Sequence, residues 1–394
     1  MAFRELILAC RIFRLVILQV AHKPTIVVYS YERETNACSV IRILDPMLAR
    51  DWNVIWASKR DGSGISFDLD VAYQADVIII HRMFPSKFTE KILRVIVMLG
   101  IPVVYDLDDL FLNVSPSHRP TYQKFAPYIK WILKEADIVI VSTPQLKKTL
   151  SKYTARPIHV KQNIIDFNLF TFPPKLRTNQ FNFLVSGTPS HQRDWAIIEE
   201  PIEEILKIYG EKIKFMYFGD TPKKFIDHPS VNIINYQPNY KLYAEQLKEL
   251  NVHAALIPLI DTNYNQCKSN IKWLEYSAAG IPGAYSDITP YNSCISHEKN
   301  GLLVKNDSTS WFNAMNQLIV DTEKTANLIK NAQREVRAQY SIESSLTEYT
   351  ATVNSLFGKE HKNNTFSELP ILHYRLRDII IDLLNRHITW RFKK

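Results

Sequence analysis

Residues 254–285 read AALIPLIDTNYNQCKSNIKWLEYSAAGIPGAY, and this stretch decides the fold. Residues 254–258 are an uninterrupted apolar run, which predicts a strand buried on both faces. Residues 269–279 predict a helix, because apolar side chains recur at helical spacing and a Gly-Ile-Pro sequence ends it sharply. Residues 281–285 predict the next strand. Strand, helix and strand in this order indicate a parallel βαβ unit.

The same alternation extends in both directions along the chain. It predicts strands at residues 25–29, 54–57, 76–80, 103–105, 138–141 and 159–160, with helices between them. Residues 167–181 interrupt the pattern and contain Pro173 and Pro174, so we expect a linker there. The alternation then restarts with strands at residues 181–185, 214–218, 231–235, 254–258 and 281–285. Residues 310–340 are expected to be mostly helical. The sequence therefore predicts an α/β protein with two Rossmann-like, doubly wound domains, at residues 22–166 and 181–340.

Composition narrows the class of protein. The 394 residues are 46% apolar and 22% charged, which favours two packed cores over disorder. A net charge of +8 suits a nucleotide, a phospholipid surface or a nucleic acid, and equally an unspecialised basic surface. No RNA- or DNA-binding motif is present, so nucleic acid is not an expected partner. No run of about 18 uncharged apolar residues predicts a membrane span.

The four cysteines, Cys10, Cys38, Cys267 and Cys294, form no CxxC or Cys/His cluster. This spacing indicates neither a zinc site nor a disulfide framework, and it fits a reducing cytoplasmic compartment.

The helix predicted at residues 269–279 carries the first candidate site. Lys268, Lys272 and Glu275 are spaced i, i+4, i+7, which would put them on one helix face. Free N–H groups near Ser269 and two lysines suit a diphosphate, and a carboxylate further along suits two ribose hydroxyls. The alternative is a solvated face with an ordinary Lys–Glu pair.

Residues 181–195, FNFLVSGTPSHQRDW, form the second candidate segment. Gly187 would let a ligand approach the backbone, Thr188 offers a hydroxyl, and His191 and Arg193 add donors for a phosphate. An ordinary strand-to-helix turn is the alternative. In a third segment, residues 290–304, Tyr291 is a candidate to stack on a base or sugar.

Residues 101–111, IPVVYDLDDLF, place Asp106, Asp108 and Asp109 after a strand of the first domain. These acids could act as a general base, hold a cation or cap the following segment; we expect Asp109 to be catalytic and no metal to be bound. Further cleft candidates are His81, Arg82, His118 and Arg119.

The ordered set SGTPSHQRDW, YFGD, NYNQCKSNIKWLEYSAAGIP and PYNSCISHEKNGLLV resembles the family 4-type glycosyltransferases with the GT-B fold. The resemblance implies two domains that face a cleft, an N-terminal domain that binds the acceptor, and a helix at residues 341–358 that returns to it. It further implies retaining, metal-independent transfer from a nucleotide diphosphate sugar to a glycan or lipid-linked acceptor, with no other cofactor. Lys268, Lys272 and Arg193 would then stabilise the leaving diphosphate.

The sequence departs from the family at several points. Of the two glutamates that the family carries eight residues apart, the second is matched by Glu275, and the first falls on Cys267. The family's basic pair has no clear match, although His191 and Arg193 occupy the region. A glycine-rich loop after the first strand is replaced by YSYERETNACSVIRI. A non-catalytic nucleotide-sugar-binding module and a nucleotide-sugar epimerase or hydrolase therefore stay open as alternatives.

Both ends of the chain combine basic with apolar residues. Residues 1–21 form an amphipathic segment, and the tail at residues 359–394 is basic and contains Trp390. Such segments lie in a membrane interface or pack on protein. The sequence predicts a cytoplasmic protein, with peripheral contact to the inner face of the membrane as one reading.

Overall fold

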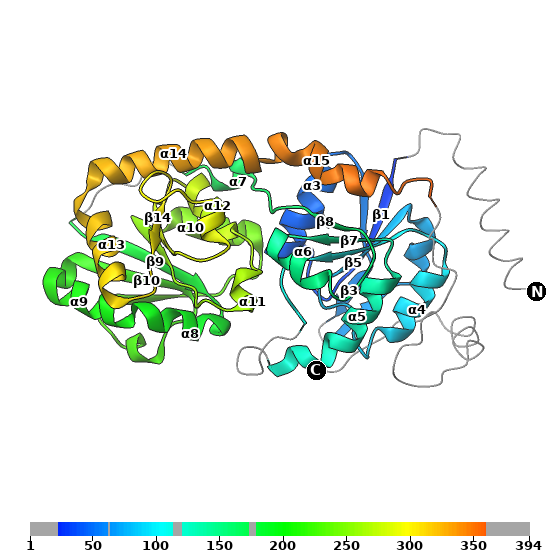
Figure 1. Cartoon of the computed structure of the whole chain (residues 1–394), viewed down its shortest axis with the longest axis horizontal. Helices are drawn as coiled ribbons and strands as arrows, with labels where there is room; N and C mark the ends of the chain where they lie inside the picture. Colours follow the sequence, from blue (N-terminus) through cyan, green and yellow to red (C-terminus); the bar gives the residue numbers. More distant parts are fainter. Residues whose placement is uncertain (1–22, 62–63, 113–119, 173–178, 360–394) are drawn as a thin grey trace, which may run out of the picture.

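The computed structural model describes residues 23–61, 64–112, 120–172 and 179–359. These residues form two α/β domains, each built on a six-stranded sheet, joined along one side of the molecule by two long helices (Figure 1). The amphipathic segment expected at residues 1–21 and the tail from residue 360 onward lie outside the described residues. So do the candidates His118 and Arg119.

The N-terminal sheet has the strand order β2-β1-β5-β6-β7-β8, with all neighbours parallel. Its strands are β1 (Thr25–Tyr29), β2 (Asn53–Trp56), β5 (Val77–His81), β6 (Val103–Leu107), β7 (Ile138–Val141) and β8 (Ile158–Val160). A separate antiparallel hairpin pairs β3 (Ser58–Asp61) with β4 (Gly64–Phe67). The winding direction reverses between β1 and β5, and ligands of doubly wound sheets bind outside the carboxyl ends at such a switch point.

The C-terminal sheet is also fully parallel, in the order β11-β10-β9-β12-β13-β14. Its strands are β9 (Phe181–Gly187), β10 (Ile213–Gly219), β11 (Val231–Asn235), β12 (Ala254–Ile257), β13 (Gly283–Ser286) and β14 (Leu302–Val304). The switch point lies between β9 and β12. The prediction of two doubly wound α/β domains is therefore confirmed.

Helices cover both faces of each sheet (Figure 1). The first domain contains α2 (Ala37–Ser39), the π-helical turn η1 (Val40–Leu44), α3 (Asp45–Leu48), α4 (Glu90–Met98), α5 (Ala126–Glu135) and α6 (Pro144–Leu150). The second contains α8 (Gln192–Trp195), α9 (Glu199–Tyr209), α10 (Tyr240–Glu249), α11 (Asn263–Gln266), α12 (Ile271–Ala278), α13 (Ser308–Val320) and α14 (Thr322–Tyr340). The helical region expected at residues 310–340 is thus two helices, which separate at Asp321, whose carboxylate caps the N–H of Lys324.

The chain returns to the first domain through α15 (Ile342–Asn354), which packs on the sheet side occupied by α3 (Figure 1). Val353 is fully buried in the core under β1 and β5, and the Tyr349 hydroxyl donates to the carbonyl of Arg42 at 2.7 Å. Arg50 donates to Thr350 at 2.9 Å. These contacts fix the end of the second domain to the first.

The segment between the domains is more ordered than the linker expected at residues 167–180. Asp166 caps a helical turn, α7 (Phe167–Phe170), and both its phenylalanines are buried in the C-terminal core. Pro173 and Pro174 lie outside the described residues. Burial of the apolar side chains of α7 against α10 and α12 stabilises this helical turn, although two prolines follow it in the sequence.

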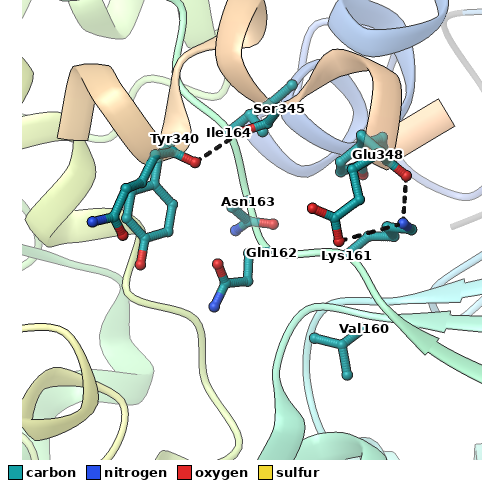
Figure 2. Close-up of a pocket in the computed structure, with 10 residues that line it drawn as sticks. Val160, Lys161, Gln162, Asn163, Ile164, Tyr340, Ser345 and Glu348 are labelled. Atoms are coloured by element: carbon teal, nitrogen blue, oxygen red, sulfur yellow. Dashed lines mark hydrogen bonds and ion pairs between the residues drawn. The ribbon is translucent and has the colours of Figure 1, made fainter. Parts of the chain in front are cut away.

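A cavity of about 330 Å³ lies beside this junction, where residues 160–164 pass under the break between α14 and α15 (Figure 2). Lys161, Gln162 and Asn163 line it from one side, and Tyr340 and Glu348 from the other. The Lys161 ammonium donates to the carbonyl of Glu348. Both connections between the domains therefore meet at one polar cavity, which is the expected position of a hinge.

Candidate functional site

The candidate site is built on the carboxyl ends of β9, β10 and β12. Gly187 and Gly219 are paired across β9 and β10, and Gly219 has φ +114°, which side-chain-bearing residues rarely adopt. An added Cβ at Gly187 would lie 2.8 Å from Cδ2 of His191 and 3.0 Å from the ring of Trp195. The absence of a side chain at Gly187 makes room for His191, and the approach of a ligand to its backbone stays a prediction.

Asp194 is the residue that ties this edge together, and it is 2% exposed. Its Oδ2 lies 2.9 Å from Nδ1 of His191. Its Oδ1 accepts from the backbone N–H of Ile260 and from the side-chain amide of Asn265, both at 2.9 Å. Burial alone would raise the pKa of Asp194, but the hydrogen bonds from His191 and Ile260 lower it. An ionised Asp194 thus joins α8 to the loop after β12, and the sequence analysis had not assigned it a role.

His191 is held by Asp194 and is partly exposed, with 24% of its side chain accessible. Burial lowers its pKa, the bond to Asp194 opposes this, and the charges of Lys268 and Lys272 lower it further. His191 is therefore neutral near pH 7. Because Asp194 is ionised, Nδ1 carries the proton that bonds to it, and Nε2 is left for another partner.

Lys268 does not share a helix face with Lys272 and Glu275, which corrects the expected stripe. α12 begins at Ile271, so Lys268 precedes the helix, and its ammonium lies 4.8 Å from the ring centroid of Tyr264. Asn270, rather than Ser269, is the residue before the first turn.

Lys272 and Glu275 form an ion pair on α12, with Nζ 3.2 Å from Oε2. The Glu275 side chain is 3% exposed and also accepts from the hydroxyl of Tyr243 at 3.2 Å. Lys272 lies over the rings of Tyr243 and Tyr276, at 5.1 and 5.6 Å from their centroids. Burial would lower the pKa of Lys272, but the charge of Glu275 outweighs it and raises the pKa. The raised pKa keeps Lys272 charged, and its ammonium is fixed between Glu275 and two aromatic rings.

The segment before α12 is held by the N-terminal domain. The Thr143 hydroxyl donates to the carbonyl of Cys267 at 3.1 Å, and the Asn163 amide donates to the hydroxyl of Ser269 at 2.9 Å. Cys267 itself is fully buried, within the hydrophobic core of the N-terminal domain. The predicted donor residue Ser269 is thus also an interdomain contact.

Behind Asn163 lies a buried ion pair of the N-terminal domain. Arg42, 1% exposed, donates two hydrogen bonds of 2.7 Å to the carboxylate of Asp106. It also donates to Oδ1 of Asn163 and to the carbonyl of Lys161, both at 3.0 Å. Asp106 is therefore a structural carboxylate, which leaves Asp108 and Asp109 as the candidates of that cluster.

The remaining predicted residues fall into different environments. The Thr188 hydroxyl lies 2.9 Å from that of Ser190 at the end of β9, and Arg193 is exposed on α8. Asp109 lies in the N-terminal domain, 3.9 Å from the guanidinium of Arg82. Tyr291 is 3% exposed and packs on Tyr285 in the core, so its expected role in stacking on a base is wrong.

The two sheet edges face each other: the N–H of Tyr240 donates to the carbonyl of Thr35 at 2.8 Å, and the Thr143 hydroxyl donates to that of Cys267 at 3.1 Å. Charges also act across this interface. Burial raises the pKa of Tyr236, Glu32 and Cys38 of the N-terminal domain raise it further, and Lys272 lowers it. Burial raises the pKa of the Cys267 thiol, and the charge of Asp109 in the N-terminal domain raises it further. His191, Lys268, Lys272 and Glu275 thus belong to one edge, opposite the acids of the other domain.

Within residues 23–61, 64–112, 120–172 and 179–359, no three His, Cys, Asp or Glu side chains are grouped to hold a metal ion. None of the helices in those ranges has the length and apolar run needed to cross a bilayer.

The chain is similar in overall structure to several solved proteins. It superimposes on sucrose-phosphate synthase from Thermosynechococcus elongatus with TM-score 0.60 and 13% identity, covering 85% of this chain and 99% of the other. For Anabaena HepE in complex with UDP and glucose, the TM-score is 0.61, the identity 16%, and the coverage 85% and 100%. The pneumococcal O-GlcNAc transferase GtfA in complex with UDP and GlcNAc superimposes with TM-score 0.53 and 13% identity. This match covers 72% of this chain and 57% of the other.

No protein-family model and no curated protein matches the chain by sequence. At these identities the structural likeness establishes the fold, which is GT-B, as the sequence resemblance predicted.

Proposed function

We propose that this protein is a glycosyltransferase that moves a sugar from a nucleotide diphosphate donor to a hydroxyl of a glycan or lipid-linked acceptor. One observation carries the proposal: His191, Lys272 and Glu275 lie together at the switch point of the C-terminal sheet, opposite the N-terminal domain. The known structures of similar fold add support, because HepE is described with UDP-glucose and GtfA with UDP and GlcNAc.

In this proposal the diphosphate lies between the end of β9 and the start of α12. The free N–H groups of the first turn of α12 point to this region, where the positive end of the helix dipole favours an anion. Lys268, Lys272 and Arg193 supply positive charge, and Thr188 and Ser269 supply hydroxyls. The protonated form of His191 would donate from Nε2 to a phosphate oxygen.

The ribose is assigned to Glu275. The hydrogen bonds that Tyr243 and Lys272 donate to Glu275 both use Oε2. A carboxylate accepts about four hydrogen bonds in total, so capacity for two ribose hydroxyls is left. Because Tyr243 and Lys272 already orient the carboxylate, little side-chain freedom would be lost on binding.

The chemistry proposed is retaining transfer without a metal. The acceptor oxygen forms a bond to the anomeric carbon as the bond from that carbon to the diphosphate oxygen breaks. The electron pair leaves with the nucleotide diphosphate, where Lys268, Lys272 and Arg193 stabilise it. A phosphate oxygen takes the proton of the acceptor, and Asp109 orients the acceptor hydroxyl. Closure at the hinge would exclude water.

The test uses the full chain with UDP-, GDP-, CDP- and ADP-sugars. We expect one nucleotide series to bind by calorimetry and to release its diphosphate faster when an acceptor is added. Binding without release would support the non-catalytic alternative, and release that acceptors do not change would support a hydrolase. Conversion of the sugar without release would support an epimerase. Each of these three outcomes contradicts the transferase.

Glu275→Gln is the matching variant. We expect it to weaken nucleotide binding by roughly 1–3 kcal/mol, because a buried charged acceptor is lost. Glu203→Gln is the control, since Glu203 is a partly exposed residue of α9 that pairs with Lys224. Equal affinity of the two variants, with both folded, would remove Glu275 from the donor site.

A further inference from the structure

The cavity at the junction of the two domains is formed by both connections between them. Residues 160–164 lead out of the N-terminal domain, and residues 339–349 lead back to it. The two connections are bonded to each other, because the N–H of Ile165 donates to the carbonyl of Tyr340 at 2.8 Å. The volume of about 330 Å³ is at the lower end for small-molecule sites, so the cavity suits a compact metabolite and is too small for a nucleotide sugar.

Lys161 places a buried ammonium beside this cavity. Its side chain is 9% exposed, and among the described residues its Nζ donates one hydrogen bond, to the carbonyl of Glu348. An ammonium has three N–H donors, so capacity for further acceptors is left. The carboxylate of Glu348 is 4.0 Å away on a side chain that is 88% exposed, which makes this ion pair weak. Burial lowers the pKa of Lys161 more than Glu348 raises it, as expected for a charge that the protein compensates only in part.

Backbone contacts hold Lys161 in this position. Its N–H donates to the carbonyl of Val141 at 2.8 Å, and its own carbonyl accepts from Arg42 at 3.0 Å. Arg42 also donates to Oδ1 of Asn163 at 3.0 Å, so the segment that carries the ammonium is fixed before and after the cavity. Little backbone freedom would therefore be lost when a ligand binds.

The rest of the lining is mostly polar. Figure 2 shows Tyr340 and Lys161 at opposite sides of the cavity, with Gln162 and Asn163 between them. Apart from Lys161 and Glu348, none of the described lining residues carries a charge. Side-chain amides and a hydroxyl can donate to the oxygens of a ligand that the ammonium holds.

Positive charge predominates around Lys161. Burial lowers the pKa of His159, and the charges of Lys161 and Lys147 lower it further, so both lysines act on the same small region. The one carboxylate of the lining, that of Glu348, is largely in solvent. An anion in the cavity would therefore be attracted, and carboxylate or phosphate oxygens would supply the acceptors that the ammonium lacks.

A second cavity, of about 220 Å³, adjoins the first. Gln162 and Tyr340 line both cavities. The second is also lined by Thr143 and by Asn270, the residue before the first turn of α12. Burial raises the pKa of Tyr340, and a hydrogen bond with Asn270 opposes that rise. Tyr340 thus joins the wall of the first cavity to the head of α12.

We propose that the cavity at the junction is an effector site for a small anion, a carboxylate or a phosphate, held by Lys161. The anion would contact both connections, so it stabilises the described arrangement of the domains over others. In this arrangement Thr143 and Asn163 bond to the segment just before α12. The expected effect is tighter nucleotide binding, and this part of the inference rests on the proposed function.

The first test measures binding of malonate and of inorganic phosphate to the full chain by calorimetry, without nucleotide. Malonamide has the shape of malonate without its charge and is the control ligand. We expect at least one anion to bind and to slow amide hydrogen exchange in the peptide that contains Ile165, and malonamide to do neither. The tighter anion identifies the group that is recognised. Binding of neither anion, or an equal effect of malonamide, would overturn the inference.

Variants locate the bound anion. Lys161→Met should weaken anion binding roughly tenfold or more, and Lys161→Arg, which keeps the charge, should retain it. Gln162→Glu adds a carboxylate at an exposed lining residue and should also weaken binding, so the site stays testable if Lys161→Met fails to fold. Lys147→Met removes an exposed lysine outside the lining and is the control. Binding that is unchanged in Lys161→Met and Gln162→Glu, or weakened as much in Lys147→Met, would refute the site.

The second test measures nucleotide affinity with and without the anion. An anion in the cavity should raise this affinity roughly 5-fold or more, and Lys161→Met should abolish the gain. An anion that binds at the proposed diphosphate site would compete instead and lower the affinity, and that outcome would contradict the inference.

Failure of this inference is distinguishable from failure of the proposed function. If an anion binds through Lys161 and no nucleotide binds, the proposed function fails and the anion site stands. If nucleotide sugars bind and transfer while their affinity does not respond to the bound anion, the effector role fails and the transferase stands.

Discussion

Replacing Gly219 by alanine tests how closely the two strand ends at the candidate site approach each other. An added Cβ would lie 2.2 Å from the carbonyl oxygen of Gly187, where real Cβ atoms keep at least 3.0 Å. β9 and β10 would have to separate by about 0.8 Å, and the residue would also have to hold φ +114°. The strain adds about 1–3 kcal/mol and the overpacking about 1–3 kcal/mol, together ~2–6 kcal/mol.

The assay is thermal unfolding of the C-terminal domain, together with nucleotide affinity. For a domain of this size each kcal/mol lowers Tm by about 2–4 °C, so Gly219→Ala should lower Tm by at least about 4 °C. Affinity should fall too, because Thr188 and His191 follow the displaced end of β9.

Gly210→Ala is the matched control for the Gly219 substitution. Gly210 also has positive φ, +55°, but an added Cβ there meets no atom within 4 Å. It therefore carries backbone strain without overpacking, and we expect a loss of about 1 kcal/mol with unchanged nucleotide affinity. Should Gly219→Ala prove no more destabilising than Gly210→Ala, the close approach of the two strand ends would be refuted.

Two further predictions concern titration and a buried charge. His191 has a pKa below its ordinary value and is neutral at pH 7, whereas a bound diphosphate favours the imidazolium, so the pKa should rise on binding. Nucleotide affinity should therefore increase as pH falls from 7.5 to 5.5, and calorimetry in two buffers should detect proton uptake on binding. His191→Gln should abolish both effects. Nucleotide affinity that does not change with pH in the wild type would contradict the role of His191 in binding phosphate. Arg42→Met leaves the Asp106 carboxylate buried without its partner and should lower the free energy of unfolding by about 3–5 kcal/mol. Arg42→Met combined with Asp106→Leu should recover most of that loss in denaturant unfolding, and no recovery would mean that Arg42 contributes mainly through Asn163 and Lys161.

The strands were predictable because strands buried on both faces are continuous apolar runs. Residues 25–29 and 138–141 were expected as strands and coincide with β1 and β7, which are buried throughout. The alternation of strands and helices, interrupted once near residue 170, then predicted the two-domain architecture. The starts of helices were predicted less accurately. α12 begins at Ile271, two residues later than expected, so Lys268 is too far from the helix to share a face with Lys272.

Side-chain environments were predicted less well than elements. Tyr291 begins a short 3-10 helix and is followed by polar residues, and the sequence does not reveal that its ring packs against Tyr285. Arg42 interrupts an apolar run at residues 40–44, which was the available signal for a buried guanidinium, but its partner Asp106 is 64 residues away. Asp194 likewise bonds to Asn265, 71 residues further on. Contacts of such separation follow from the sheet topology and not from local pattern.

Cys267 stands where the resembled family carries a glutamate, and its surroundings link the proposed donor site to the domain interface. Cys267 is fully buried in the core of the N-terminal domain, with its carbonyl bonded to Thr143 and its thiol 3.5 Å from the hydroxyl of Thr149. Burial raises the pKa of the thiol, and Asp109 raises it further. The same surroundings would strongly disfavour an ionised carboxylate.

A glutamate is therefore incompatible with the way this segment packs, and its replacement by cysteine allows the first domain to hold residues 267–269. The bonds from Thr143 and Asn163 meet that segment just before α12 begins. Any opening of the domains must break them and release the start of the helix proposed to bind the diphosphate. Donor binding and domain closure would then stabilise each other, because both depend on the same few hydrogen bonds at the head of α12.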